Sequence, residues 1–187
     1  MPLSRDFYER DAATVARGLL GKVLIKDGMS GTIVETEAYY GEDDPASHAF
    51  NGETERNRVM FGEPGRVYVY LCYGVYHLLN ITTHSKGRPG AVLIRALEPR
   101  EGLDEMKSNR GLRDKSQLTS GPGKLTQAMD IDLDQNGVDV TKEDAEIRIE
   151  RGREVEEREI DKSSRIGISH GQDRQLRFFL RDSEYVS

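Results

Sequence analysis

Two carboxylates occupy positions in the sequence where a soluble sheet normally carries apolar side chains. The run GTIVETEAY at 31–39 has the composition of a strand, and the alternation of strand side chains predicts Glu35, Glu37 and Tyr39 on one face. Burying an ionised carboxylate without partners is energetically costly. We therefore expect a water-filled cleft, a cation or hydrogen-bond donors around these two groups.

An arginine inside a second apolar run is the candidate partner. Arg95 interrupts the strand-like segment 91–97 and needs an anion there. Glu37 and Arg95 form the strongest predicted pair, because each would be costly to bury alone. The pattern supports two interpretations equally: an ion pair that only joins strands, and a pair that takes part in catalysis.

Tyrosines are concentrated in two short segments, at positions 39, 40, 68, 70, 73 and 76. Such rings can sandwich a planar base, although a place in the core is the commoner role for any one of them. Tyr73 is the exception, because it precedes Gly74 at the predicted tip of a hairpin. Asn80 lies in an apolar strand, where its amide can satisfy backbone groups or read the edge of a base.

Basic side chains in the middle of the chain are candidates for binding phosphate. The formal net charge of −6 argues against a polyanionic partner, but 13 of the 33 acidic residues lie between 130 and 161. Residues 50–128 hold 12 basic and 8 acidic residues, so one face can still be cationic. Within this range, Arg56, Arg58 and Lys124 are the phosphate candidates, and Lys124 lies near a predicted helix start.

The strands and helices that the sequence predicts around these residues indicate an α+β fold. Apolar runs predict strands at 22–25, 31–39, 67–73, 75–82, 91–97 and 147–150, with shorter strands or turns at 165–168 and 176–180. Helical spacing predicts helices at 12–20, about 100–109 and 120–129, with Asp11 and Ser120 as N-caps and Pro99 ending the preceding strand. Because strands and helices do not alternate, we expect a mostly antiparallel, curved sheet flanked by helices.

The length of 187 residues predicts one domain, spanning residues 1–187. The single cysteine, Cys72, excludes intrachain disulfides and cysteine-rich metal sites. No run has the length of a membrane helix, and charges near the start argue against a signal peptide, so we expect a soluble, cytoplasmic protein. The segment 121–124 lacks the first glycine of a phosphate loop, since Leu118 stands there.

Taken together, several motifs closely resemble the alkyladenine (3-methyladenine) DNA glycosylase family. They are Glu35–Tyr39, His48, Arg56–Arg58 with Met60 and Phe61, Tyr68–Gly74, Asn80–Ile81, Leu93–Pro99 and Ser120–Leu125. The resemblance runs from about residue 5 to residue 182 with the motifs in family order. It implies a monomeric enzyme that binds duplex DNA, flips out a damaged purine nucleotide and hydrolyses the bond between base and sugar without a metal or other cofactor.

The resemblance also implies roles for individual residues. Glu37 would be the general base that activates water, and Arg95 would hold that water and Glu37. Tyr39 and His48 would contact the flipped base, with Tyr70 on its opposite side.

Further positions correspond to one more residue of the base pocket, Asn80, and to residues of the family that contact the rest of the DNA. Tyr73 would enter the minor groove, and Asn80 would clash with the amino group of guanine. The expected contacts to the DNA backbone are Thr54, Arg56, Arg58 and Lys124. The implied lesions are 3-methyladenine, 7-methylguanine, hypoxanthine and ethenoadenine, whose excision starts base excision repair.

Two alternatives remain open at the level of sequence. A noncatalytic binder of damaged DNA would keep its function in a Glu37→Gln variant. A metal-dependent hydrolase would lose activity with a chelator, and its ligands would come from Glu37, Asp43, Asp44, His48 and either His77 or His84. The spacing of these residues matches no compact ligand motif.

Overall fold

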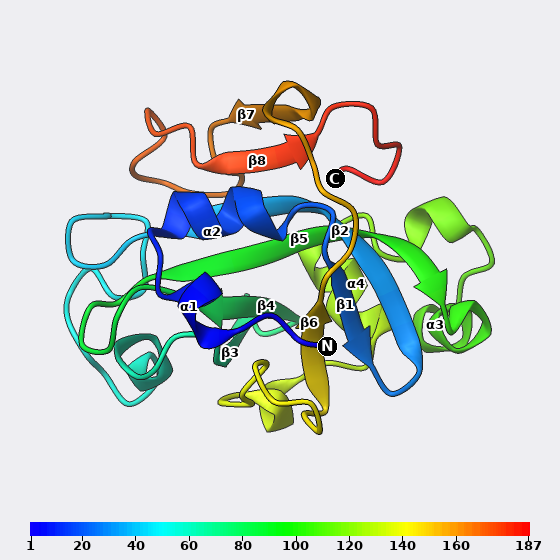
Figure 1. Cartoon of the computed structure of the whole chain (residues 1–187), viewed down its shortest axis with the longest axis horizontal. Coiled ribbons are helices and arrows are strands. Elements are labelled where there is room, and N and C mark those ends of the chain that lie inside the picture. Colours follow the sequence, from blue (N-terminus) through cyan, green and yellow to red (C-terminus); the bar gives the residue numbers. More distant parts are fainter.

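A curved antiparallel sheet runs through the whole molecule in the computed structural model, which describes residues 1–187 (Figure 1). Its strands are β1 (Val23–Lys26), β2 (Met29–Tyr39), β3 (Val67–Cys72), β4 (Tyr76–Thr82), β5 (Ala91–Glu101), β6 (Ile147–Glu150), β7 (Ile160–Ser163) and β8 (Arg177–Leu180). Six strands follow the order β3-β4-β5-β2-β1-β6, while β8 pairs with both β2 and β7. All seven strand pairings are antiparallel, which confirms the predicted sheet.

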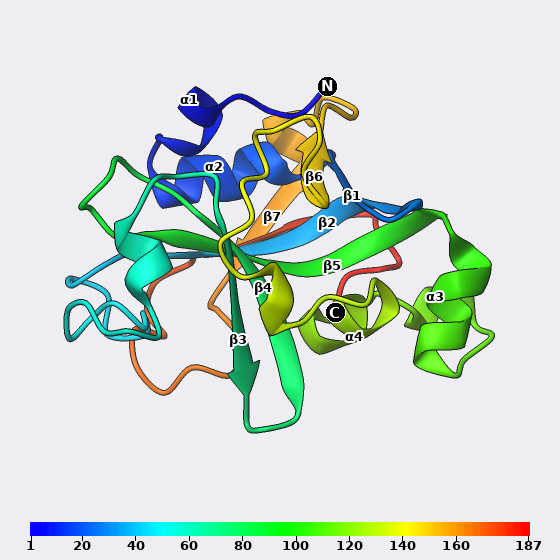
Figure 2. The same ribbon diagram turned by 90° about the horizontal axis from the view of Figure 1, so that it is seen from below.

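Helices cover the central strands from both sides. They are α1 (Arg5–Tyr8), α2 (Ala12–Leu19), α3 (Leu103–Arg110) and α4 (Pro122–Ala128), supplemented by short 3-10 turns at Arg58–Phe61, Lys115–Gln117, Leu133–Gln135 and Glu157–Glu159. Figure 2 shows α1 and α2 above β2 and β5, and α3 and α4 below them. None of the helices has the length and apolar composition needed to cross a membrane.

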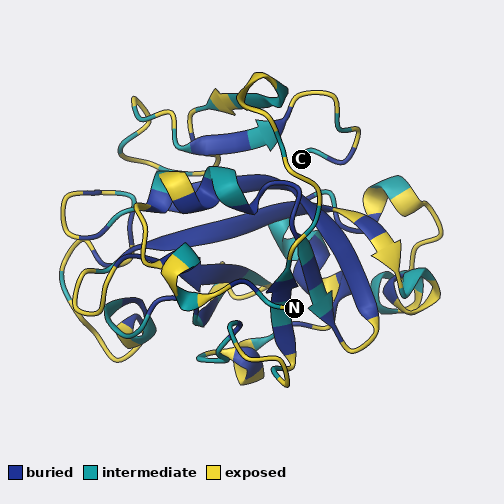
Figure 3. Cartoon of the chain, in the orientation of Figure 1, coloured by how far each residue is buried: buried dark blue, intermediate teal, exposed yellow.

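The sequence explains why α2 begins and packs where it does. Asp11 caps the helix, because its carboxylate accepts hydrogen bonds from the backbone N–H groups of Ala13 and Thr14, as predicted. The apolar face at Ala12, Val15, Ala16 and Leu19 is buried against the sheet. This face belongs to a core of 32 buried residues, and β2 and β5 are buried along most of their length (Figure 3).

The pairing of β2 with β5 is irregular where the two glutamates lie. Ile33 pairs with Leu97 and Glu35 with Ala96, so Val34 is an extra residue on β2. The next pair skips Arg95, which is therefore an extra residue on β5. Such bulges bend strands and re-aim side chains. They interrupt the simple alternation predicted from residue 33, although Glu35 and Glu37 still reach the same arginine.

Two predicted boundaries were wrong. Strand β5 continues through Pro99 to Glu101, because β4 pairs with it only along residues 91–93 and leaves a free edge beyond, where a proline removes no ladder hydrogen bond. The following helix therefore starts at Leu103. Helix α4 has Gly121 rather than Ser120 at its N-cap, because Pro122 takes the first helical position.

Candidate active site

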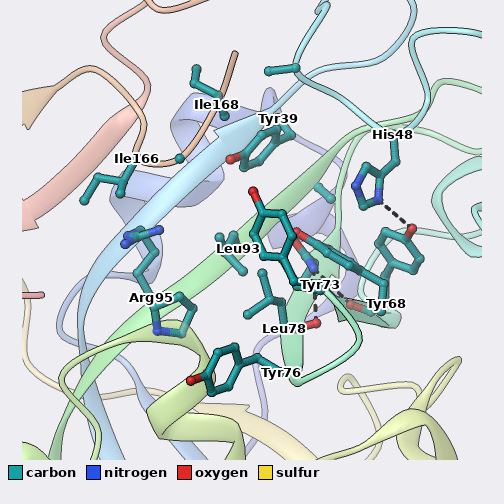
Figure 4. A pocket seen from close by; sticks show the side chains of 18 of the residues that line it. Tyr39, His48, Tyr68, Tyr73, Tyr76, Leu78, Leu93, Arg95, Ile166 and Ile168 are labelled. Atoms are coloured by element: carbon teal, nitrogen blue, oxygen red, sulfur yellow. Dashed lines mark hydrogen bonds between the residues drawn. The ribbon is translucent and has the colours of Figure 1, made fainter. Parts of the chain in front are cut away.

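A pocket of about 790 Å³ opens between the sheet, the β3–β4 hairpin and two loops (Figure 4). Tyr39 of β2 and Leu93 and Arg95 of β5 line it from the sheet. The hairpin strands add aromatic and polar side chains, and the loops at 45–48 and 166–170 and the start of α4 complete the lining. The volume is in the range of pockets that enclose small-molecule ligands, so a purine base can enter.

Glu37 lies directly behind the wall of this pocket and is fully buried. Its Oε2 accepts a 2.8 Å hydrogen bond from the Tyr39 hydroxyl, and its Oε1 accepts a 2.7 Å bond from the backbone N–H of Ile166. Arg95 Nη1 lies 3.4 Å from the same Oε1. Tyr39, Ile166 and Arg95 all line the pocket, so the neighbours of the carboxylate lie between it and the pocket.

Glu35 is the closer partner of Arg95, which corrects the prediction that Glu37 and Arg95 form the strongest pair. Arg95 Nε donates to Glu35 Oε1 at 2.9 Å, and Arg177 Nε donates to the same oxygen at 2.6 Å. Burial alone would raise the pKa of Glu35, but the hydrogen bonds from Ser187 and the two guanidinium groups outweigh it and lower that pKa. Glu35 is therefore ionised at neutral pH.

A second buried ion pair joins the two loops that flank the pocket. Arg165 donates to both carboxylate oxygens of Asp44, at 2.6 and 2.9 Å, and both side chains are fully buried. The Arg165 guanidinium also lies 4.6 Å from the centre of the Tyr39 ring. Burial would raise the pKa of Asp44, but the bonds from Arg165 and from two backbone N–H groups lower it. The pair therefore fixes the loop that carries His48 against the loop that carries Ile166.

His48 and two tyrosines form an aromatic wall. His48 Nδ1 lies 2.9 Å from the Tyr68 hydroxyl, and its ring centre lies 4.3 Å from that of Tyr70. Burial, together with the positive charge of Arg56, lowers the pKa of His48, so the ring is neutral at pH 7. Burial raises the pKa of Tyr70 and of Tyr39, and both phenols stay protonated.

Asn80 is buried and lines the same pocket. Its side-chain amide donates to the backbone oxygens of Tyr68 and, at a longer distance, Leu78. The amide therefore helps to hold the strands of the hairpin, which is one of the two roles that the sequence left open.

Tyr73 lies at the tip of the β3–β4 hairpin and is 88% exposed. It and Gly74 have φ values of +51° and +68°, as the two central residues of a tight hairpin turn require. Leu71, Val75 and Tyr76 beside it are also exposed, so the tip is an apolar projection into solvent. Exposed apolar groups gathered in this way mark a surface that a partner covers.

The residues predicted to contact the DNA backbone differ in how close they lie to the pocket. Lys124 lines the pocket, and its Nζ lies 3.0 Å from Gln117 Oε1. Arg56 is exposed, with its guanidinium 5.4 Å from the centre of the Tyr70 ring. Arg58 lies 3.5 Å from Glu53 on the surface, and the Thr54 hydroxyl accepts a bond from the backbone of the same loop.

Several residues of the site were not predicted. They are Arg165, Arg177 and Ser187 in the buried clusters, and Arg110 and His170 in the pocket lining. Arg177 opens the apolar run Arg177–Leu180, so the argument used for Arg95, that an arginine within a buried strand needs an anion, would have found it. Ser187 and His170 carry no such local signal.

The residues of the alternative metal site do not converge. No group of three or more histidine, cysteine or acidic side chains lies close enough to hold a metal ion. Asp44 is bound to Arg165, and His84 Nε2 accepts a hydrogen bond from the backbone N–H of Ala12 at the start of α2. This donor set does not fit a metal-dependent hydrolase.

Comparison with known proteins supports the resemblance seen in the motifs. The model of the family described as methylpurine-DNA glycosylase (MPG) matches residues 6–184. A protein from Carboxydothermus hydrogenoformans is 47% identical, with 100% of this chain and 99% of the relative covered. One from Methanocella arvoryzae is 49% identical, with 99% and 95% covered. Both bear the name "Putative 3-methyladenine DNA glycosylase".

Proposed function

Because the chain belongs to the methylpurine-DNA glycosylase family, we propose that its pocket receives a damaged purine nucleotide flipped out of duplex DNA, and that Glu37 activates the water that releases the base. The enzyme class is that of a 3-methyladenine DNA glycosylase, a hydrolase of the N-glycosyl bond. The observation that carries the proposal is a buried carboxylate, held by Tyr39, Arg95 and Ile166, immediately behind a pocket with an aromatic wall.

The chemistry requires few protein groups. Glu37 accepts a proton from water while the water oxygen forms a bond to C1′ of the flipped nucleotide. The bond from C1′ to the base nitrogen breaks, and its electron pair leaves with the base. Arg95 orients the carboxylate through the contact of its Nη1 with Glu37 Oε1. Because water rather than a lysine amine is the nucleophile, no Schiff base forms and the DNA strand is not cleaved.

The pocket favours alkylated purines through its aromatic faces. Alkylation at a ring nitrogen makes the base cationic, and each contact of a cation with a tyrosine face contributes about 0.5–2 kcal/mol. Tyr39 and Tyr70 would supply such faces, and the neutral His48 adds no opposing charge. The same positive charge makes 3-methyladenine and 7-methylguanine good leaving groups. Hypoxanthine and ethenoadenine are neutral, so their release also needs protonation of the leaving base.

The hairpin tip and the rim of the pocket would bind the rest of the DNA. Flipping a base costs a few kcal/mol of stacking and pairing. Tyr73 would fill the gap in the minor groove, and Asn80 would reject a guanine by contact with its amino group. Backbone phosphates would meet Arg56 and Lys124 near the pocket, with Thr54 and Arg58 further out on the same surface. We propose that the protein acts as a monomer in the cytoplasm at the start of base excision repair.

The test is single-turnover release of base, in EDTA, from duplexes that each carry one lesion: 7-methylguanine, hypoxanthine or ethenoadenine. We expect wild-type release and a loss of at least about 100-fold in the Glu37→Gln variant, the usual scale for removing a general base. The control is Glu98→Gln, the same change at an exposed position of β5 away from the pocket. Equal rates for Glu37→Gln and wild type would refute Glu37 as the base.

The two alternatives have distinct outcomes in the same experiment. Tight binding to damaged duplexes without release by either protein would identify a noncatalytic damage binder. Loss of wild-type release in EDTA that is restored by added divalent metal would identify a metal-dependent hydrolase.

A further inference from the structure

Glu35 is the centre of a buried cluster that the proposed chemistry does not use. Its carboxylate is fully buried and accepts four hydrogen bonds. Oε1 receives Arg95 Nε at 2.9 Å, Arg177 Nε at 2.6 Å and the Ser187 hydroxyl at 2.8 Å. Oε2 receives the backbone N–H of Ser187 at 2.6 Å. So complete a set of donors fixes the position of this carboxylate.

The donors of Arg95 are divided between this cluster and the proposed active site. Its Nε is bonded to Glu35, and its Nη2 donates to the Ser187 hydroxyl at 3.2 Å. Only Nη1 faces Glu37, at 3.4 Å. The guanidinium is planar and rigid, so the two bonds on one side determine where the third nitrogen points.

We propose that Glu35 and the Ser187 hydroxyl are positioning residues, which hold Arg95 in the orientation that leaves a single guanidinium nitrogen for Glu37 and its water. This inference rests on the proposed function, in which Glu37 is the general base. Glu35 acts through Arg95 and contacts neither the base nor the attacked carbon.

The charges of the cluster explain why Glu35 matters to the reaction. Two carboxylates, Glu35 and Glu37, face two guanidinium groups, Arg95 and Arg177. Without the charge of Glu35, Glu37 would be the only acidic side chain left beside Arg95, and Arg95 would turn towards it. A carboxylate in that state holds its negative charge more firmly and accepts a proton from water less readily.

The experiment compares Glu35→Gln with Arg177→Met by single-turnover release of ethenoadenine or 7-methylguanine over a range of pH, with lesion-duplex affinity measured in parallel. Both variants break the buried cluster, but only Glu35→Gln frees Arg95. For Glu35→Gln we expect a rate at least about tenfold lower, an acidic limb of the rate profile moved to lower pH, and affinity within about threefold of wild type. For Arg177→Met, which leaves both orienting bonds of Arg95 in place, we expect a rate within about threefold of wild type and an acidic limb that does not move to lower pH.

A purely structural role for Glu35 would give a different result. Both variants would then lose thermal stability, and the rate profile of the folded protein would keep its wild-type shape in each. That outcome, or equal rate losses in the two variants, would overturn the inference. If Glu35→Gln does not fold, Ser187→Ala takes its place, because it removes one of the two bonds that orient Arg95. An unchanged rate profile in Ser187→Ala would likewise overturn the inference.

Failure of the inference and failure of the proposed function can be told apart. An active Glu37→Gln variant would refute the proposed function. An inactive Glu37→Gln variant together with a wild-type rate profile for Glu35→Gln would refute only the positioning role.

Discussion

Glu35 and Glu37, two positions apart on one strand, have different surroundings. Glu35 has four donors, two of which are arginine Nε groups, so it is a fixed negative charge. Glu37 has a tyrosine hydroxyl, one backbone N–H and the far nitrogen of one arginine. Fewer and weaker partners leave Glu37 lone pairs for water. The sequence places both acids on the same strand, but only their partners distinguish the carboxylate held by four donors from the proposed general base.

His48 makes stability depend on pH in the window just below neutrality. Its folded pKa lies below the usual value of about 6.5, which the unfolded chain approaches. Between the two pKa values the unfolded chain binds more protons, so the free energy of unfolding falls as pH is lowered through this window. We expect His48→Gln to reduce this fall without abolishing it, because burial also lowers the pKa of His84.

Urea unfolding at pH 7.5, 6.5 and 5.5, values on both sides of the usual histidine pKa of about 6.5, measures the effect. A pH dependence equal to that of wild type in His48→Gln would mean that folding does not change the affinity of His48 for its proton. Titration of the buried carboxylates does not affect this comparison. The pKa values of Glu35 and Asp44 are lowered, so their contribution is lost only at more acidic pH.

At the scale of elements, the pocket depends on two loops that lie outside the helices and strands. The segments 41–57 and 164–176 contain no strand, and the Asp44–Arg165 pair joins them. Arg165 precedes Ile166, whose N–H binds Glu37, and Asp44 lies four residues before His48. One buried ion pair thus places the loop of His48 and the backbone N–H that binds Glu37 relative to each other.

Breaking this pair from one side should destabilise the protein strongly. Asp44→Asn leaves the Arg165 guanidinium buried without its counter-ion, which costs about 3–5 kcal/mol. The double variant Asp44→Asn/Arg165→Gln removes both charges, and we expect it to recover part of this loss. Chemical unfolding of both variants measures the difference. A cost below about 1 kcal/mol is typical of an exposed ion pair, and would contradict a stabilising role for the buried Asp44–Arg165 pair.

Local patterns predicted the elements better than they predicted the site. Strands β2, β3, β4 and β5 follow from apolar composition and glycine turns, and Arg95 was found because it interrupts one of them. The clusters behind the pocket were not predicted, because 121 positions separate Asp44 from Arg165 and 142 separate Glu35 from Arg177. The periodicity of a strand or helix gives no information about contacts between residues so far apart in the sequence. Only the folded sheet, in which β8 lies beside β2, brings these residues together.

At the scale of the whole molecule, charge is distributed in a way that suits a DNA-binding face. Within the acidic segment 130–161, Figure 2 shows β6 at the end of the molecule opposite the tip of the β3–β4 hairpin, whereas the turn Leu133–Gln135 packs against β3. Many of these acids are also paired with basic groups, for example Asp139 with Arg5 and Glu154 with Lys22. Much of the negative charge is therefore paired or lies away from the hairpin tip.

Salt dependence of DNA binding tests this arrangement. Each phosphate neutralised by a basic side chain adds about 0.9 to the slope of log K against log salt, so we expect Arg56→Gln to lower the slope by about 1. Lys142→Gln is the matched control, since Lys142 is exposed within the acidic segment and should leave the slope unchanged. Binding to an undamaged duplex, measured by anisotropy between about 50 and 200 mM salt, gives both slopes. An equal reduction in the two variants would mean that net charge, rather than the face around the pocket, governs the approach to DNA.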